Sequence, residues 1–279
     1  MPDINYPIAG VIGQPITHSL SPLLHHYWLA KMNLFGRYEA RDIAVDDINF
    51  FFDDLRQAEV GWVGCNVTLP HKIAALENCD SLSPTAKKIG AVNTITLRDK
   101  KLYGDNTDGF GFIKNLESWQ DFRDSKKSCA VILGAGGAAR GVIYGLQALG
   151  YQHIVVINRT LDKLQNLQKD FGVIIAGIND IKKYLDEANI LVNATSLGLA
   201  GEDVPIDFKK LPKGILLHDI IYGATPTPFL KKGRQFGFAT RDGLDMFIYQ
   251  AVIGFKQWFH SDKNPPIDDE LRQYLLSCR

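Results

Sequence analysis

The sequence predicts an α/β protein with two successive units, and three observations support this fold class. Strand-like runs alternate with helical runs from the start of the chain, which is typical of parallel strands joined by helical crossovers. A charged stretch without apolar periodicity, residues 121–128, interrupts this alternation, and a second series begins directly after it. The 279 residues are enough for two domains of ordinary size.

The first series contains three strands, three helices and a hairpin. Its first helix opens at Ser21, where a serine cap and a proline at the first helical position, Pro22, are expected to coincide. The elements in order are a strand at 6–13, a helix at 21–32, a strand at 37–43, a helix at 46–58, a strand at 61–68, a hairpin at 93–105 and a helix at 111–119.

The second series has the same alternation, and its strands are short apolar runs of the buried type. Two final helices have no strand between them and fit on either unit. The elements in order are strands at 129–133, 153–158, 188–196 and 215–221, helices opening at 137 and at 161, and the final helices at 244–259 and 267–277.

Composition excludes several classes of function. Lysine and arginine number 31, as do aspartate and glutamate, so no net charge attracts nucleic acid or an anionic membrane. The four cysteines form no C-x-x-C pair and the histidines no metal-ligand spacing, so we expect reduced thiols and no metal. No leader-like or membrane-spanning run stands out, and we expect a soluble cytoplasmic protein.

A glycine motif follows the strand at 129–133. Gly134, Gly136 and Ala139 have the G-x-G-x-x-G/A spacing at the opening of a helix, where a tight turn, close approach of a pyrophosphate and close helix packing need small residues. The strand and helix around the motif favour a dinucleotide site. A glycine turn without a ligand and a methyltransferase site are the alternatives.

The end of the next strand indicates which dinucleotide is bound. An NAD site usually has an acidic residue there for the ribose 2′-hydroxyl, whereas this chain has Asn158, Arg159 and Thr160. Arg159 would attract a 2′-phosphate, and Lys163 adds a second positive charge one helical turn later. These residues favour NADP, and ordinary surface cations are the alternative.

A second group of polar residues lies in the first series. In "NVTLPHK", residues 66–72, Pro70 is expected to start a helix, which places Lys72 in its first turn. Amide dipoles at a helix N-terminus disfavour an ammonium group, and a lysine destabilised in this way gives up its proton more readily. Lys72 is therefore either a general acid/base or an exposed surface lysine. Asp108 precedes a helical pattern as a possible cap, Asn93 is a possible turn residue, and a lone histidine such as His71 is usually structural.

The motifs together resemble the shikimate dehydrogenase family over roughly residues 6–259. The blocks, in order, are "HSLSP", "NVTLPHK", "GAVNT", "GDNTDGFG", "GAGGAAR", "NRT", "NATS", "DIIYGATPTPFL" and "DGLDMFIYQA". The resemblance implies reversible, NADPH-dependent reduction of 3-dehydroshikimate to shikimate on the route to chorismate and aromatic amino acids. It also implies an α/β substrate domain with a mostly parallel sheet, residues 1–109 with 245–279, and a Rossmann-type NADP-binding domain, residues 110–244.

The resemblance implies a role for each matching residue. Lys72 and Asp108 would be the catalytic pair. The partner would be a small-molecule substrate, and the protein would be a monomer or a homodimer. The residues implied to bind substrate are Ser19, Ser21, Thr68, Lys72, Asn93, Asp108, Tyr222 and Gln250. Those implied to bind NADP are Gly134, Ala135, Gly136, Gly137, Ala138, Asn158, Arg159, Thr160, Lys163, Thr195, Ser196, Ile220 and Gly243.

Two positions differ from the family pattern, and two functional alternatives remain. Ala224 stands where the family often has proline, and Asp245 where it often has glycine. Both lie beside the residues implied to hold the nicotinamide, so they bear on local loop shape. The alternatives within this fold are an NAD-using quinate/shikimate dehydrogenase, against which Arg159 argues, and a dinucleotide sensor without catalysis.

Overall fold

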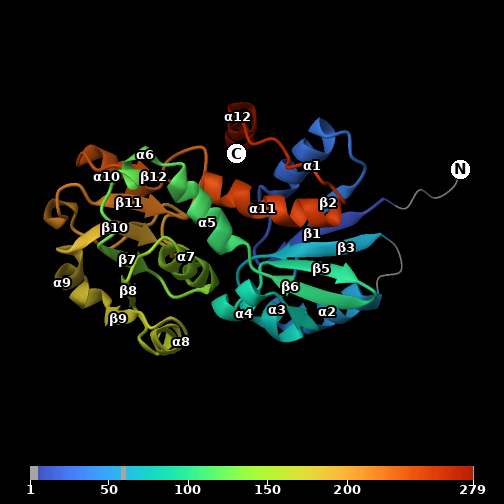
Figure 1. Cartoon of the computed structure of the whole chain (residues 1–279), viewed down its shortest axis with the longest axis horizontal. Helices are drawn as coiled ribbons and strands as arrows, with labels where there is room; N and C mark the ends of the chain where they lie inside the picture. Colours follow the sequence, from blue (N-terminus) through green and yellow to red (C-terminus); the bar gives the residue numbers. More distant parts are fainter. Residues whose placement is uncertain (1–5, 58–60, 279) are drawn as a thin grey trace, which may run out of the picture. The chain divides into compact units, whose positions relative to one another are not determined.

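The computed structural model describes residues 6–57 and 61–278, and the chain forms two compact units (Figure 1). The first unit consists of the residues up to Thr107 together with Gln250–Cys278, and the second of Asp108–Tyr249. The polar stretch 121–128 lies inside the second unit, and its first residues form part of the short helix α6 (Gln120–Arg123), in which Phe122 is buried. Of the helices described, none is long and apolar enough to span a membrane.

The first unit is built on a six-stranded mixed sheet in the order β2-β1-β3-β5-β6-β4. Strands β1, β2 and β3 are parallel, as are β4 and β6, whereas β5 is antiparallel to both of its neighbours. The predicted hairpin is confirmed, and its turn residues Asp99 and Lys100 both have positive φ. The strands are β1 (Ile8–Gly13), β2 (Arg37–Asp42), β3 (Trp62–Val67), β4 (Ser81–Leu82), β5 (Thr94–Arg98) and β6 (Lys101–Asp105).

Helices cover both faces of this sheet, with α2, α3 and α4 on one side and α1 and the C-terminal part of α11 on the other (Figure 1). Helices α1 and α11 contact each other through the rings of Trp28 and Phe255, whose centroids are 5.3 Å apart. Trp258 of α11 donates its indole N–H to the Ile95 carbonyl oxygen at 3.0 Å. The helices are α1 (Ser21–Lys31), a 3-10 turn at Val45–Asp47, α2 (Ile48–Gln57), α3 (Lys72–Asn78), α4 (Pro84–Ile89), α11 (Leu244–Trp258) and α12 (Asp269–Ser277).

The second unit has a six-stranded, fully parallel sheet in the order β12-β11-β10-β7-β8-β9. Numbered from β7 as the unit's first strand, this is the 3-2-1-4-5-6 order of the dinucleotide-binding fold. The predicted fold class is confirmed. The strands are β7 (Cys129–Leu133), β8 (His153–Asn158), β9 (Ile174–Gly177), β10 (Ala188–Asn193), β11 (Leu216–Asp219) and β12 (Thr240–Arg241).

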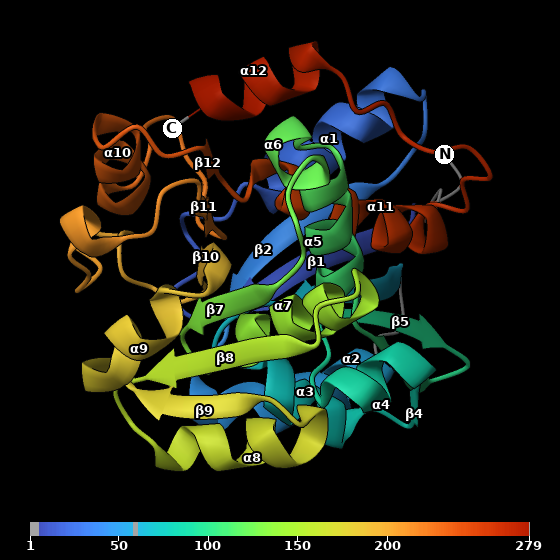
Figure 2. The same cartoon turned by 60° about the vertical axis from the view of Figure 1, so that its left-hand side comes forward.

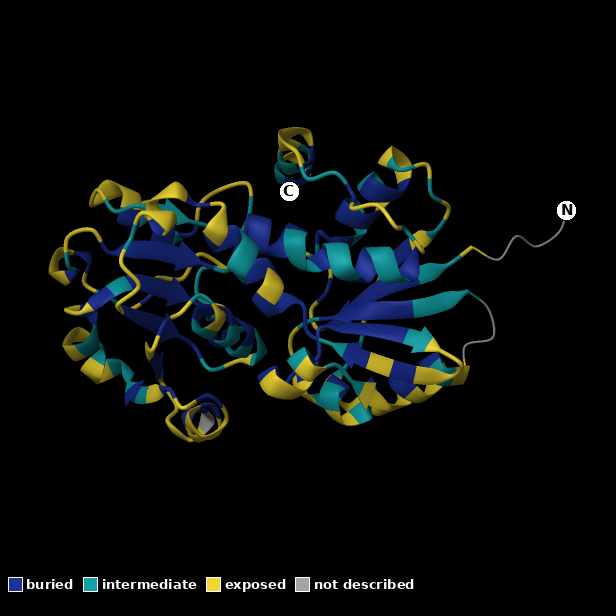
Figure 3. Ribbon diagram, viewed as in Figure 1, coloured by how far each residue is buried: buried dark blue, intermediate teal, exposed yellow. Residues whose placement is uncertain are grey.

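Both faces of the second sheet are buried, which explains the uninterrupted apolar strands (Figure 3). Ile132 and Val156 pack toward α5, α7 and α8, whereas Val131 and Val155 pack toward α9 and α10. Figure 2 shows α8 running beside β9 in this unit. The helices are α5 (Asp108–Glu117), α7 (Gly137–Ala148), α8 (Asp162–Phe171), α9 (Ile181–Leu185) and α10 (Pro228–Gln235), with 3-10 turns at Ile178–Asp180 and Phe208–Lys210.

Candidate active site

The glycine turn after β7 is fixed by its neighbours in the second unit. Gly134 has a φ of +108°, which side-chain-bearing residues rarely adopt, and its amide donates to the Ile157 carbonyl oxygen at 2.8 Å. A Cβ at Gly134 would lie 2.7 Å from the Ala194 carbonyl oxygen. Glycine is therefore required at this position by both backbone conformation and space.

The N-terminus of α7 is open to an anion. Gly136 is the N-cap, no side chain caps the helix, and no acidic residue lies in its first turn, which begins at Gly137. A Cβ at Gly136 would meet nothing within 4 Å. Ala135 and Ala138 are half-buried on either side. Unused amide N–H groups and free space at a helix N-terminus suit a phosphate group, so this turn fits the pyrophosphate of a dinucleotide.

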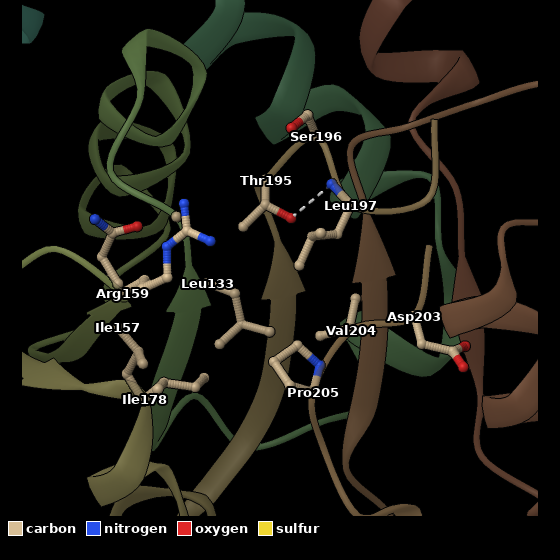
Figure 4. A pocket seen from close by; sticks show the side chains of 12 residues that line it. Leu133, Ile157, Arg159, Ile178, Thr195, Ser196, Leu197, Asp203, Val204 and Pro205 are labelled. Atoms are coloured by element: carbon tan, nitrogen blue, oxygen red, sulfur yellow. Dashed lines mark hydrogen bonds between the residues drawn. The ribbon is translucent and has the colours of Figure 1, made fainter. Parts of the chain in front are cut away.

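A cavity of about 480 Å³ lies at the carboxyl ends of the strands of this sheet. Figure 4 shows Leu133 at the end of β7, Arg159 after β8, and Thr195 and Ser196 after β10, with Val204 and Pro205 on the loop opposite Arg159. The chain order reverses between β7 and β10, and open α/β sheets bind ligands at such a switch point. Gly134, Ile157, Asn158, Ile178, Leu197 and Asp203 complete the lining.

The end of β8 presents a cation to this cavity. Arg159 and Thr160 are exposed, and the Asn158 amide donates to the Thr160 carbonyl oxygen at 2.9 Å, which holds the turn. Lys163 lies in the first turn of α8, and its side chain is outside the described part of the structure. No acidic residue ends β8, so Arg159 fits a 2′-phosphate at the cavity rim.

A buried network shapes the loop after β10. The Thr195 hydroxyl donates to Asn193 Oδ1 at 2.6 Å and accepts from the Leu197 amide at 3.1 Å. Asn193 in turn donates to the Asp219 carboxylate at 3.1 Å, and Thr227 donates to the same carboxylate at 2.7 Å. Burial raises the pKa of Asp219 to about 6, although these hydrogen bonds oppose the shift. This network links the loops after β10 and β11, and its members Asn193 and Asp219 were not predicted.

Ile220 and Gly243 lie in contact. A Cβ at Gly243 would be 2.0 Å from the Ile220 carbonyl oxygen, and the Gly243 amide donates to the Ile221 carbonyl oxygen at 3.3 Å. Tyr222 stacks on Phe247 with ring centroids 4.6 Å apart. Three residues that the sequence assigns to ligand binding, from the segments after β11 and β12, therefore lie in one region of the second unit.

In the first unit, Asn93 is the centre of a buried polar network. Its Oδ1 accepts from the Thr107 amide at 2.8 Å and from the Thr94 hydroxyl at 2.9 Å. Its Nδ2 donates to Thr107 Oγ1 at 3.0 Å and to Gln250 Oε1 at 3.3 Å. The structure thus brings Asn93 and Gln250 together across 157 residues of sequence. Thr94 and Thr107 were missed, because a lone threonine gives no local signal.

The turn before α3 differs in detail from the prediction. Pro70 follows a cis peptide bond and lies in a turn, so it does not start the helix; α3 begins at Lys72. The Lys72 carbonyl oxygen accepts from the Val92 amide at 2.9 Å, and the Thr68 amide donates to the Ile12 carbonyl oxygen at 2.9 Å. His71 is buried, with Nε2 2.7 Å from the Ile43 carbonyl oxygen. This geometry fits a structural role for His71.

The expected serine cap of α1 is also wrong. Leu20 is the N-cap and Ser21 the first helical residue, whose amide donates to the Ser19 hydroxyl oxygen at 3.3 Å. The two serines remain neighbours at the start of α1. Asp108 is the buried first residue of α5 in the second unit. It packs against α7, because a Cβ added at Gly141 would lie 2.7 Å from the Asp108 Cβ.

These features define a protein that binds a dinucleotide through its second unit, which has the parallel sheet. Its first unit is also of the α/β class and has a polar site of its own. The sequence family described as shikimate dehydrogenase substrate binding domain matches residues 11–95, and the family described as shikimate / quinate 5-dehydrogenase matches residues 117–200.

Known proteins are similar over almost the whole chain. A shikimate dehydrogenase (NADP(+)) of Brucella melitensis is 40% identical over 275 residues, which cover 96% of this chain and 93% of that protein. The crystal structure of shikimate dehydrogenase from Aquifex aeolicus has a TM-score of 0.86 at 33% identity and covers 99% of both chains. That of the Thermus thermophilus enzyme, in complex with NADP(H) and shikimate, has a TM-score of 0.83 at 31% identity and covers 98% of this chain and 100% of that one. The chain belongs to the shikimate dehydrogenase family.

Proposed function

We propose that this protein catalyses the reversible, NADP-dependent interconversion of shikimate and 3-dehydroshikimate. The observation that carries the proposal is the pairing of two sites in one chain. The second unit has an uncapped glycine turn, an open cavity and Arg159 at its rim. The first unit has the Asn93 and Gln250 network beside the segment that carries Thr68 and Lys72.

The cofactor would be held by residues of the second unit. The amides at Gly136 and Gly137 would receive the pyrophosphate, and Arg159 the 2′-phosphate, with Lys163 as a second cation. Ile220 and Gly243 would flank the nicotinamide. When bound, NADP⁺ supplies the hydride acceptor for alcohol oxidation. The remaining residues assigned to it are Gly134, Ala135, Ala138, Asn158, Thr160, Thr195 and Ser196.

The substrate would be held by two sets of neutral polar side chains with separate tasks. Ser19, Ser21 and Tyr222 would hold the carboxylate. Thr68, Asn93 and Gln250 would contact the ring hydroxyls, and the hydrogen bond that Asn93 donates to Gln250 supports a fixed orientation of both amides. An orientation set before binding lowers the entropic cost of ordering the substrate.

Proton transfer would be the task of Lys72 and Asp108. Oxidation of a secondary alcohol removes a hydride from carbon and a proton from oxygen. The neutral amine of Lys72 would accept that proton, and the resulting ammonium would return it to the carbonyl oxygen in the reverse direction. Asp108 would orient the hydroxyl and the amine by hydrogen bonding.

The experiment mixes purified protein with shikimate and NADP⁺ and follows the absorbance of NADPH. We expect turnover, with a higher kcat/KM for NADP⁺ than for NAD⁺ and for shikimate than for quinate. Absence of turnover by folded protein that binds NADPH would favour a sensor instead. Calorimetric binding of S-adenosylmethionine without binding of NADPH would favour a methyltransferase.

Location and assembly belong to the same proposal. The cysteines Cys65, Cys79, Cys129 and Cys278 are free thiols, which fits a reducing, cytoplasmic environment. We expect a monomer or homodimer, which sedimentation equilibrium measures directly.

A further inference from the structure

We propose that Arg241 and Asp245 form a clamp across the Gly243 turn and act as positioning residues for the nicotinamide end of the cofactor. The inference rests on the proposed function, which assigns Gly243 and Ile220 to that end of NADP. It gives Asp245, where the family pattern often has glycine, a task that the sequence does not reveal.

The turn itself is closely packed against Ile220. Asp242 and Gly243 join β12 to α11, and a Cβ at Gly243 would be 2.0 Å from the Ile220 carbonyl oxygen. The Gly243 amide donates to the Ile221 carbonyl oxygen at 3.3 Å. A shift of this turn therefore changes the spacing between the segments that follow β11 and β12.

The clamp joins the two ends of the turn. Arg241 ends β12 and Asp245 lies in the first turn of α11, four residues later, and Arg241 Nη2 is 2.5 Å from Asp245 Oδ2. The Asp245 side chain is only 9% exposed and that of Arg241 29%. An ion pair this well shielded is less weakened by solvent and salt than a pair on the open surface.

Helix α5 anchors the clamp. Arg241 Nε donates to Asn115 Oδ1 and Arg241 Nη2 to Ser118 Oγ, each at 2.8 Å. Asn115 is fully buried, and its Nδ2 donates to the Asp242 carbonyl oxygen at 2.7 Å. The planar guanidinium thus connects the strand end, the helix start and α5 at once, which a lysine cannot do with the same geometry.

The arrangement predicts an effect on one end of the cofactor only. Without Asp245 the guanidinium loses its only carboxylate partner among the described residues, and the turn loses the link between its two ends. The glycine turn at 134–137 and the Arg159 rim are held by other contacts, those of Ile157 and of Asn158. Binding of the adenosine half of NADP is therefore expected to be independent of the clamp.

The experiment compares NADP⁺ with adenosine 2′,5′-bisphosphate, which has the 2′-phosphate and lacks the nicotinamide. Calorimetric Kd values for both ligands are measured on the wild type, Asp245→Ala, Arg241→Ala and Arg241→Lys, together with the Tm of each. We expect both alanine variants to bind NADP⁺ on the order of tenfold more weakly and the bisphosphate unchanged. Arg241→Lys should fall between them and the wild type, because it retains the charge opposite Asp245.

The matched control is Glu117→Gln, which removes the exposed ion pair of Glu117 with Lys114 on α5 and should change neither Kd. Equal weakening of both ligands, or a lower Tm with both Kd values unchanged, would overturn the proposal. If Asp245→Ala does not fold, Asp245→Asn, which keeps an acceptor oxygen, is measured in its place against the same criteria. A wild type that binds the bisphosphate but neither NADP⁺ nor NAD⁺ would instead refute the proposed function.

Discussion

The first unit builds its polar site from side chains, whereas the second builds its site mainly from backbone. Asn93, Thr107 and Gln250 satisfy one another in the first unit, and each of their hydrogen bonds joins residues distant in sequence. In the second unit, Gly134 forms the turn after β7, and Gly136, two residues later, leaves the amides at the start of α7 accessible. Site chemistry in the first unit therefore depends on specific side chains, and cofactor binding in the second depends on space and backbone conformation.

The largest expected effect is that of Lys72→Ala in the first unit. Proton transfer by a positioned group typically contributes about 10²- to 10⁴-fold to rate, so kcat should fall by about that factor. KM and the Kd for NADP⁺ should change little, because the proton moves only in the transition state. Steady-state kinetics and calorimetry measure both. Lys87→Ala, at an exposed position of α4, is the control, and near-normal kcat in Lys72→Ala would remove Lys72 from the mechanism.

A pair of glycine variants tests the backbone character of the second site. Gly136→Ala should leave Tm unchanged, since its Cβ meets nothing, but should weaken NADP⁺ binding by about 10²-fold because the methyl group occupies the pyrophosphate's place. Gly134→Ala should lower the free energy of unfolding by on the order of 1–3 kcal/mol, because φ is +108° there and the Cβ would meet Ala194. Calorimetry and urea titration separate the two effects. Unchanged NADP⁺ affinity in Gly136→Ala would contradict the assignment of this turn.

Arg159→Ala should have a smaller and selective effect. Loss of a charged hydrogen bond to the 2′-phosphate should raise the KM for NADP⁺ about tenfold or more and leave the KM for NAD⁺ unchanged. Initial rates with both cofactors measure the ratio. Arg234→Ala, at an exposed position of α10, is the control. Parallel changes for both cofactors would mean that Arg159 does not read the 2′-phosphate.

The same contrast explains how much of the fold and of the candidate site could be predicted from the sequence. The glycine spacing and the residues after β8 are local signals, since the constraints on Gly134, Gly136 and Arg159 arise within one strand, turn and helix. The strand alternation likewise predicted the fold class. Short elements without a full period of apolar residues, such as β12 and α10, gave no such signal.

Non-local contacts account for what the sequence did not reveal. Asn93 meets Gln250, Asn193 meets Asp219, and Arg241 meets Asn115, in each case through tertiary structure. Likewise, α3 begins at Lys72, two residues after the expected position, and Pro70 lies in the turn before it. The catalytic roles of Lys72 and Asp108 remain predictions from the family resemblance.

The smallest predicted effect concerns buried histidines, which also differ between the units. In the first unit His25 is fully buried, stacks on Tyr38, and has no hydrogen-bond partner for either ring nitrogen within the described structure. Burial, assisted by His26, holds its pKa well below 6.5. Below pH 6.5, His25 is therefore protonated in the unfolded chain and neutral in the folded unit. The free energy of unfolding should decrease by up to ~1.4 kcal/mol per pH unit as pH falls below about 6.5.

The second unit should respond less, because two adjacent groups act in opposite directions. Burial lowers the pKa of His218 to about 3, which reduces stability as pH falls below about 6.5. Burial also raises the pKa of Asp219 to about 6, so the cost of burying its charge is relieved as pH falls through 6 toward the unfolded value near 4. Hydrogen exchange at pH 7 and pH 5, corrected for intrinsic rates, should show a greater loss of protection in β1–β3 than in β7–β11. His25→Phe should reduce that loss in the first unit alone; an undiminished loss in the first unit of this variant would mean that other groups govern the acid response.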